Sequence, residues 1–253
     1  MNMMMRALSA EALKLRGTLA LWASLIAPAL VVALIVLQLT IRDVTRPEPM
    51  APAEAWVAFA SMALQLWAFL MMPLFITLQS ALLAGLEHAN HQWKHLLSLP
   101  VPKGIHYLAK LAALLALTAL ALLVLGLLLP LGGWMLMRLH PELGLGGPPP
   151  WKMLATAIPA CLAASALIIA IHTWVSIRWR NFTVAVSVGI AATVAGFLIM
   201  QSRKYGMYYP WSMPLQVFAN DGAHLRFAVT ASLLGGSLVS LAGLWNFVRH
   251  EDA

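Results

Sequence analysis

Between two long apolar segments lies the sequence GLEHANHQWKHLLSLPVPKGIHY, residues 85–107. Wound as an α-helix at 100° per residue, residues 86–99 separate into two faces. The apolar face holds Leu86, Ala89, Trp93, Leu96 and Leu97, and the polar face holds Glu87, His88, His91, Lys94, His95 and Ser98. Pro100 and Pro102 end the helix, because proline lacks the backbone N–H. The separation predicts a short helix at the boundary between an apolar and an aqueous phase, where its charged face can contact a soluble partner.

The composition indicates a membrane protein. Of the 253 residues, 61% are hydrophobic and only 10% are charged, whereas a soluble protein carries about 25% charged residues. Six stretches contain no Asp, Glu, Lys or Arg, and each can supply the roughly 20 apolar residues of a transmembrane helix. We therefore predict an all-α integral membrane protein with one transmembrane domain over residues 1–253. A β-barrel is excluded, because its strands would be short and would alternate apolar with polar residues.

The predicted elements are an interfacial helix over 5–16, spans over about 18–41, 55–84, 106–137, 152–177, 182–201 and 226–248, and the amphipathic helix over 86–99 between spans two and three. In the interfacial helix, Leu8, Ala12 and Leu15 recur at helical spacing and are expected to form its apolar face. The first apolar run is too long for a signal peptide and is expected to stay as a span. Pro28 and Pro73 predict kinks, and Pro130, Gly132 and Gly133 are expected to break the outer end of span three.

The charge distribution favours both termini in the cytoplasm. With that orientation, nine of the 16 lysines and arginines lie on the cytoplasmic side, which is a small bias of the expected sign. The net charge of +7 is explained by basic residues that flank spans and meet anionic lipid headgroups, so no nucleic-acid partner is expected. Cys161 is the single cysteine, which excludes an intramolecular disulfide and a cysteine-based zinc cluster.

The polar residues within the spans and the aromatic residues before the last span each allow two interpretations. Gln65, Gln79 and His172 lie within apolar segments, where a polar side chain either bonds a neighbouring helix or lines a substrate path. Tyr208, Tyr209 and Trp211 precede the last span. They form either an aromatic belt at the lipid headgroups or an outer vestibule that holds an amphipathic substrate.

Span five carries small residues at helical spacing, at Ala185, Gly189, Ala192 and Gly196. Small residues four apart allow helices to approach closely. This stripe is therefore a candidate interface with a second permease chain, although a sequence rich in alanine and glycine also produces such spacing by chance.

Motifs for chemistry on this chain are missing. The glycine-rich run 144–150 has no Gly-Lys-Ser/Thr after it, so it is not a phosphate-binding loop. His88, His91 and His95 share one helix face and could bind a metal, but a hydrated surface facing a partner is the simpler explanation. The zinc-protease pattern H-E-x-x-H is absent. We therefore expect no catalytic residue, no metal and no cofactor on this chain.

Three stretches resemble the ABC-2 type transporter permeases, and most closely the branch that serves bacitracin and lantibiotic immunity. They are EALKLRGT at 11–18 running into a span with Pro28, EHANHQWKHLLSLPV at 87–101 followed by Tyr107 and Lys110, and YPWSMP at 209–214. The second stretch is similar to that family's cytoplasmic coupling helix. The resemblance implies that coupling to an ATPase depends on Glu87, His91, Trp93, Lys94, Leu96, Leu97 and Pro100.

The resemblance also implies the partners. Two permease chains, identical or different, would pair with two soluble P-loop ATPases that bind ATP and Mg²⁺, in the bacterial cytoplasmic membrane. The cargo would be antimicrobial peptides or similar amphipathic molecules, moved out of the membrane for resistance or self-immunity. Alternatives are another cargo, such as a lipid, a cation or a component for cytochrome or copper-site assembly, and a membrane sensor or scaffold that does not pump. An intramembrane enzyme is disfavoured, because no paired catalytic residues are evident.

Overall fold

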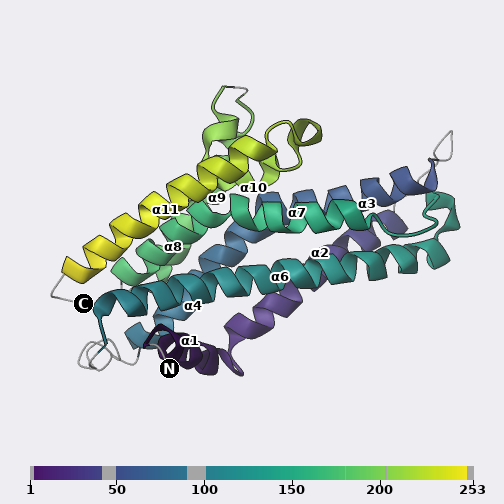
Figure 1. Ribbon diagram of the computed structural model, residues 1–253. Helices are drawn as coiled ribbons and strands as arrows, with labels where there is room; N and C mark the ends of the chain where they lie inside the picture. Colours follow the sequence, from purple (N-terminus) through teal and green to yellow (C-terminus); the bar gives the residue numbers. More distant parts are fainter. Residues whose placement is uncertain (1–2, 42–49, 90–100, 180, 203, 250–253) are drawn as a thin grey trace.

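The computed structural model describes residues 3–41, 50–89, 101–179, 181–202 and 204–249 (Figure 1), with the side chains of residues 86–89, 220 and 221 left out. Within these ranges the chain is helical and contains no strand. Six helical segments there are long and apolar enough to cross a membrane, which confirms the predicted all-α integral membrane fold. The elements are α1 (Met3–Leu15), α2 (Leu19–Ile41), α3 (Pro52–Leu66), the π-helical segment η1 (Trp67–Met71), α4 (Met72–Ala89), α6 (Lys103–Leu139), η2 (Pro141–Leu143), α7 (Trp151–Ala164), α8 (Ala166–Arg178), α9 (Phe182–Ile199), η3 (Gly206–Tyr208), η4 (Pro210–Ser212), α10 (Met213–Gln216), η5 (Ala219–Gly222) and α11 (Leu225–Arg249).

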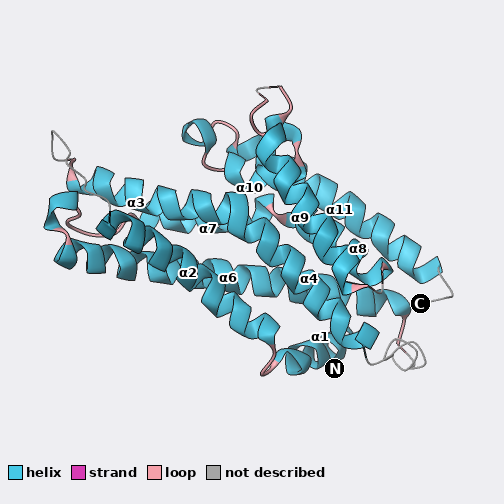
Figure 2. Cartoon of the chain, turned by 180° about the vertical axis from the view of Figure 1, so that it is seen from behind, coloured by secondary structure: helices cyan, strands magenta, loops and turns pink. Residues whose placement is uncertain are grey.

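The helices form one elongated bundle with both chain ends at the same side (Figure 1). The end that carries α1 also carries the last turns of α4, the start of α6 and the end of α11. The opposite end carries the start of α3, the end of α6 and η2. Helix α4 lies inside the bundle and packs against α2, α6, α8 and α9 (Figure 2). A movement of α4 would therefore reach most of the spans.

Pro73 shapes the second span. Proline cannot donate a backbone hydrogen bond, and its ring crowds the carbonyl four residues earlier, here that of Phe69. The helix accommodates this with the π-helical segment η1, which surrounds Phe69 and joins α3 to α4. The Thr77 hydroxyl donates to the Pro73 carbonyl oxygen at 2.8 Å. Because π segments are common at functional sites, the middle of this span is a candidate region for function.

Helix α6 is not broken at Pro130, which corrects the break expected in its outer end. It continues to Leu139 and has 37 residues, or about 55 Å of helix against a hydrocarbon core of about 30 Å. The glycines after Pro130 serve close packing instead. Gly133 lies against the Trp56 ring of α3, and a Cβ atom at Gly132 would stand 2.7 Å from Val32 of α2.

The fourth span is interrupted at Ser165, between α7 and α8. Ser232 of α11 bridges the interruption, because its hydroxyl donates to the Ala164 carbonyl oxygen at 2.8 Å and accepts from the Leu167 N–H at 3.0 Å. Next to it, Gly236 lets α11 approach the backbone of Ala166. In a membrane every backbone group needs a partner, so this serine makes the broken helix tolerable.

Candidate functional site

Most of the predicted coupling helix lies outside the described residues. His91, Trp93, Lys94, Leu96, Leu97 and Pro100 fall in the undescribed range, as do His91 and His95 of the histidine face. Residues 86–89, which include Glu87 and His88, continue α4 as regular helix. Span two therefore leads without a break into the start of the predicted coupling helix, so movement there would be passed along α4.

An ion pair joins α1, α4 and α6 close to that point, and the sequence did not predict it. The Lys110 ammonium of α6, only 4% exposed, lies 3.4 Å from the Glu11 carboxylate of α1. It also donates to the Leu83 carbonyl oxygen of α4 at 3.0 Å. Lys14, one helical turn from Glu11, contacts its other carboxylate oxygen at 2.9 Å. Three elements are thus held together near the last turns of α4.

Glu11 lies on the side of α1 that packs against the bundle. It is buried there, whereas Leu8 and Ala12 of the predicted apolar face are exposed on the surface of the chain. Burial alone would raise the pKa of Glu11, but the neighbouring Lys110 and Lys14 outweigh it and hold that pKa below its usual value. Two features of the sequence could have revealed this pair. Glu11 is an acid in a helix with an apolar face, and Lys110 lies just inside a span that is otherwise uncharged.

Gln79 belongs to the packing of α4 against α2. Its side-chain amide donates to the Ala20 carbonyl oxygen at 2.8 Å and to the Ser24 hydroxyl at 3.2 Å. The side chain is completely buried. These are interhelical hydrogen bonds of the kind that the sequence offered as one of two explanations for Gln79.

Three of the predicted substrate-path residues come together where α4, α8, α9 and η4 meet. His172 lies 3.2 Å from the Thr77 hydroxyl, and its ring is edge-on to Trp211 at 5.7 Å. Tyr209 continues the ring contacts at 5.6 Å from Trp211. Its hydroxyl donates to the Ala192 carbonyl oxygen at 2.7 Å. This buried cluster connects the segment before the last span to the middle of α4, directly after η1.

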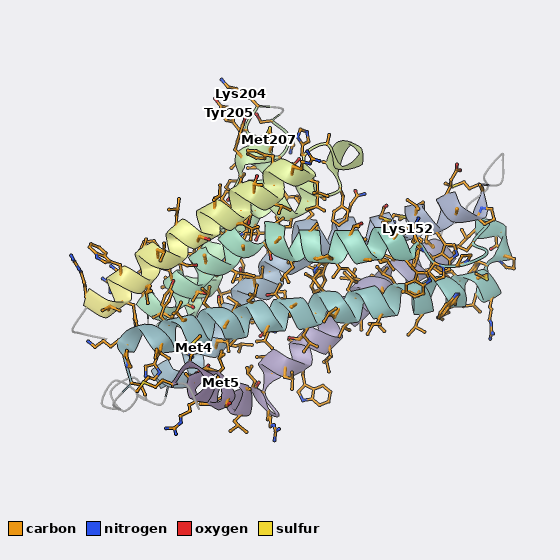
Figure 3. The ribbon with its side chains drawn as sticks, in the orientation of Figure 1. Met4, Met5, Lys152, Lys204, Tyr205 and Met207 are labelled. Carbon is orange, nitrogen blue, oxygen red and sulfur yellow. The ribbon has the colours of Figure 1, made fainter. Side chains whose placement is uncertain are left out.

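Tyr208 stands apart from this cluster. It is 57% exposed and contacts Phe227 of α11 edge-on, with ring centres 5.4 Å apart. The nearby Lys204, Tyr205 and Met207 project at the tip of the same segment (Figure 3). This exposed part fits the aromatic belt that the sequence offered as one explanation.

The small residues of α9 face the interior of the bundle. Ala185 packs with Ala81 and Val175, and Gly189 lies against the Thr77 and His172 side chains with no room for a Cβ atom. Ala192 and Gly196 both contact Tyr209. The stripe is used for packing within the chain, which corrects its assignment to an interface with a second chain. Spacing alone could not distinguish the two, because both need the same small residues.

Gln65 lines a separate groove of about 330 Å³ on the outside of the bundle. The groove lies between α3, α7 and the segment that leads into α11. Gln65 and Ser61 are four residues apart on α3 and so share one face, opposite Thr156 of α7. Gln65, one of the predicted substrate-path residues, thus lines a described cavity together with other polar groups.

Comparison with known proteins identifies the relationship. A model of the ABC-2 family transporter proteins matches residues 7–196, which is most of the chain. Neither the curated proteins nor the solved structures contain a significant match. The matched region runs from α1 through α9 and includes the coupling-helix segment and the Glu11–Lys110 ion pair.

Proposed function

Because the chain belongs to the ABC-2 transporter family, it is a permease subunit of an ABC transporter, and we propose that it exports antimicrobial peptides of the bacitracin or lantibiotic kind. The family match, on a chain with six membrane-spanning helices, is the observation that carries the transporter assignment. Family membership implies an ATPase partner, which would bind ATP and Mg²⁺. In the proposed assembly two permease chains lie in a bacterial cytoplasmic membrane with their termini inside.

Coupling would begin at the helix over residues 86–99. Closure of the ATPase dimer pushes on this helix, with Glu87 and Lys94 facing the ATPase and Trp93, Leu96 and Leu97 anchored towards the spans. Because α4 runs unbroken into residues 86–89, the displacement continues along α4. There it meets the Lys110 bond at Leu83, the Gln79 bonds to α2 and the Thr77–His172 contact. These contacts are the means by which one displaced helix would shift its neighbours between two arrangements.

The segment before the last span is the proposed release side. Tyr209 and Trp211 connect this segment to His172 in the bundle, so a shift of α4 at Thr77 would reach it. Its exposed tyrosines, Tyr205 and Tyr208, suit contact with an amphipathic substrate at the membrane surface.

The first experiment is to purify the tagged chain from its native host in mild detergent and to identify its partners by mass spectrometry. A stoichiometric P-loop ATPase is expected, and a second permease chain would show a heterodimer. ATPase activity of the complex should rise with bacitracin or nisin if peptides are the cargo. A reproducible preparation without any ATPase would favour the sensor or scaffold alternative.

Variants of the coupling helix test the mechanism. Glu87→Ala and Trp93→Ala should abolish peptide-stimulated ATP hydrolysis while the permease stays in the membrane. Glu54→Ala, at the opposite end of the bundle, serves as the control. Full stimulation in both coupling variants would contradict the proposed route.

A further inference from the structure

The groove at Gln65 combines apolar walls with a short row of polar groups. Val57, Ser61 and Gln65 lie four residues apart along α3, so their side chains share one face. Gln65 is about 20 Å along the helix axis from Pro52, the first residue of α3, so the groove reaches well into the span. The described lining residues are Val57, Ser61, Gln65, Met153, Thr156, Ala157, Val217, Phe218, Gly222 and Leu225.

The polar groups in the groove are available to a ligand. The Gln65 side chain is exposed, and its carboxamide, which has two N–H donors and a carbonyl acceptor, has no hydrogen bond to the described residues. The Thr156 hydroxyl gives its hydrogen to the Lys152 and Met153 carbonyl oxygens at 3.0 Å and keeps acceptor capacity. Because unpaired polar groups are costly at membrane depth, the groove favours a ligand with both donors and acceptors.

The lining also excludes one class of ligand. Among the described residues of the lining there is no Lys, Arg, Asp or Glu. An anionic lipid headgroup would therefore find no cation among them, although charge-assisted bonds from Arg or Lys are the usual way to hold a phosphate. The groove instead matches an uncharged ligand whose hydrogen-bonding groups alternate with apolar ones.

We propose that this groove binds an uncharged stretch of peptide main chain that carries apolar side chains. In an extended peptide the N–H and the C=O of one residue point to the same side, so the Gln65 carboxamide can accept from the N–H and donate to the C=O together. Val57, Met153 and Phe218 then take the apolar side chains of the ligand. The volume of 330 Å³ suffices for a small ligand and so for a few residues of a longer peptide. This site rests on the proposed peptide export and names the part of the cargo that would be recognised.

The test measures protection of a cysteine placed in the groove. Val57 is 44% exposed, so Val57→Cys should react with a fluorescent maleimide, whereas the native Cys161 is fully buried. The probes are acetyl-Leu-Ala-Leu-Ala-Leu-amide and the same peptide with every backbone nitrogen methylated. With the full chain in nanodiscs, the first peptide should slow labelling and the methylated one should not, because it has lost its N–H donors.

Gln65→Leu, made in the Val57→Cys background, should raise the half-protecting concentration of the peptide about tenfold, as the loss of two neutral hydrogen bonds predicts. The matched control is Gln38→Leu, because Gln38 is an exposed glutamine on α2 outside the groove, and it should leave that concentration unchanged. Thr156→Val is a second, nearly isosteric variant with the same expected direction. It keeps the test decisive if Gln65→Leu does not elute as a single species.

The remaining outcomes separate this site from the export itself. Equal protection by both peptides, no protection by either, or protection by dihexanoyl phosphatidylglycerol that depends on Gln65 would each overturn peptide recognition here. None of these results depends on an ATPase, so the export proposal would still be open. Conversely, Gln65-dependent binding of a peptide that does not stimulate the ATPase of the purified complex would support the site and contradict the export.

Discussion

The two halves of α4 are held in the bundle by different forces. At the end near the termini, the Lys110 ammonium binds the Leu83 carbonyl oxygen and the Glu11 carboxylate. Nearer the middle, α4 relies on neutral groups, with Gln79 bonded to α2 and Thr77 beside His172. Charged contacts cost much to leave unpaired, whereas neutral bonds between membrane helices contribute little each. The comparison suggests that the end next to the coupling helix is fixed in place and that the middle can rearrange.

The largest effect should come from breaking the charged end. Lys110→Met leaves the Glu11 carboxylate buried beside Lys14 alone, and loss of one partner of a buried pair costs about 3–5 kcal/mol. Denaturation in mixed micelles should show this decrease in the free energy of unfolding. Lys152→Met, at an exposed lysine of α7 (Figure 3), should change it by less than about 0.5 kcal/mol.

A double variant sharpens this result. Adding Glu11→Leu to Lys110→Met removes the carboxylate that is left with Lys14 as its one described partner, and should recover much of the lost stability. A double variant that is less stable than Lys110→Met would mean that Glu11 does not depend on Lys110.

The neutral middle is tested by Gly189→Ala. The new Cβ atom would meet the Thr77 side chain and stand 2.7 Å from the His172 ring, so overpacking should cost about 1–3 kcal/mol. Gly196→Ala is the matched control on the same helix. Its Cβ atom would make an ordinary contact, 3.4 Å from the Tyr209 ring, and alanine favours helix. Equal losses of stability in both variants would contradict the packing described for α9.

A smaller effect is expected at the interruption of span four. Ser232→Ala leaves the Leu167 N–H and the Ala164 carbonyl oxygen without the side chain that pairs them, at a cost of about 1 kcal/mol in a membrane protein. The exposed Ser237 on the same helix provides the control, because Ser237→Ala removes a hydroxyl that bridges no break. Hydrogen exchange at Leu167 should be faster in Ser232→Ala and unchanged in Ser237→Ala.

The sequence predicted the spans well because their signal is long and strong. Twenty uncharged residues between charged flanks identify a membrane helix whatever its partners are. Orientation about the helix axis is a weaker signal, since a lipid-facing side and a protein-facing side are both apolar. For that reason the sequence did not predict the ion pair of Glu11, and it left two alternatives open for Gln79. It also assigned the small residues of α9 to an interface. Pro130 shows the same limit, because Gly133 was expected to break α6 and instead makes room for Trp56.

The smallest expected effect is the pH dependence of stability that comes from Glu11. It tests the charged end of α4 separately from the neutral middle. Its pKa in the folded chain lies below the value of about 4.3 for an unfolded glutamate. The ionised carboxylate therefore stabilises the fold. This contribution is fully present above the unfolded pKa and is lost as the pH falls through the lower, folded pKa. The difference in unfolding free energy between the native chain and Glu11→Gln should thus be constant from pH 7 to about pH 5.5 and should decrease below about pH 4.5. A difference that increases on acidification would mean that burial, and not Lys110 with Lys14, determines the pKa of Glu11. The two halves of α4 would then no longer differ in the way proposed, because the ion pair would not stabilise the charged end.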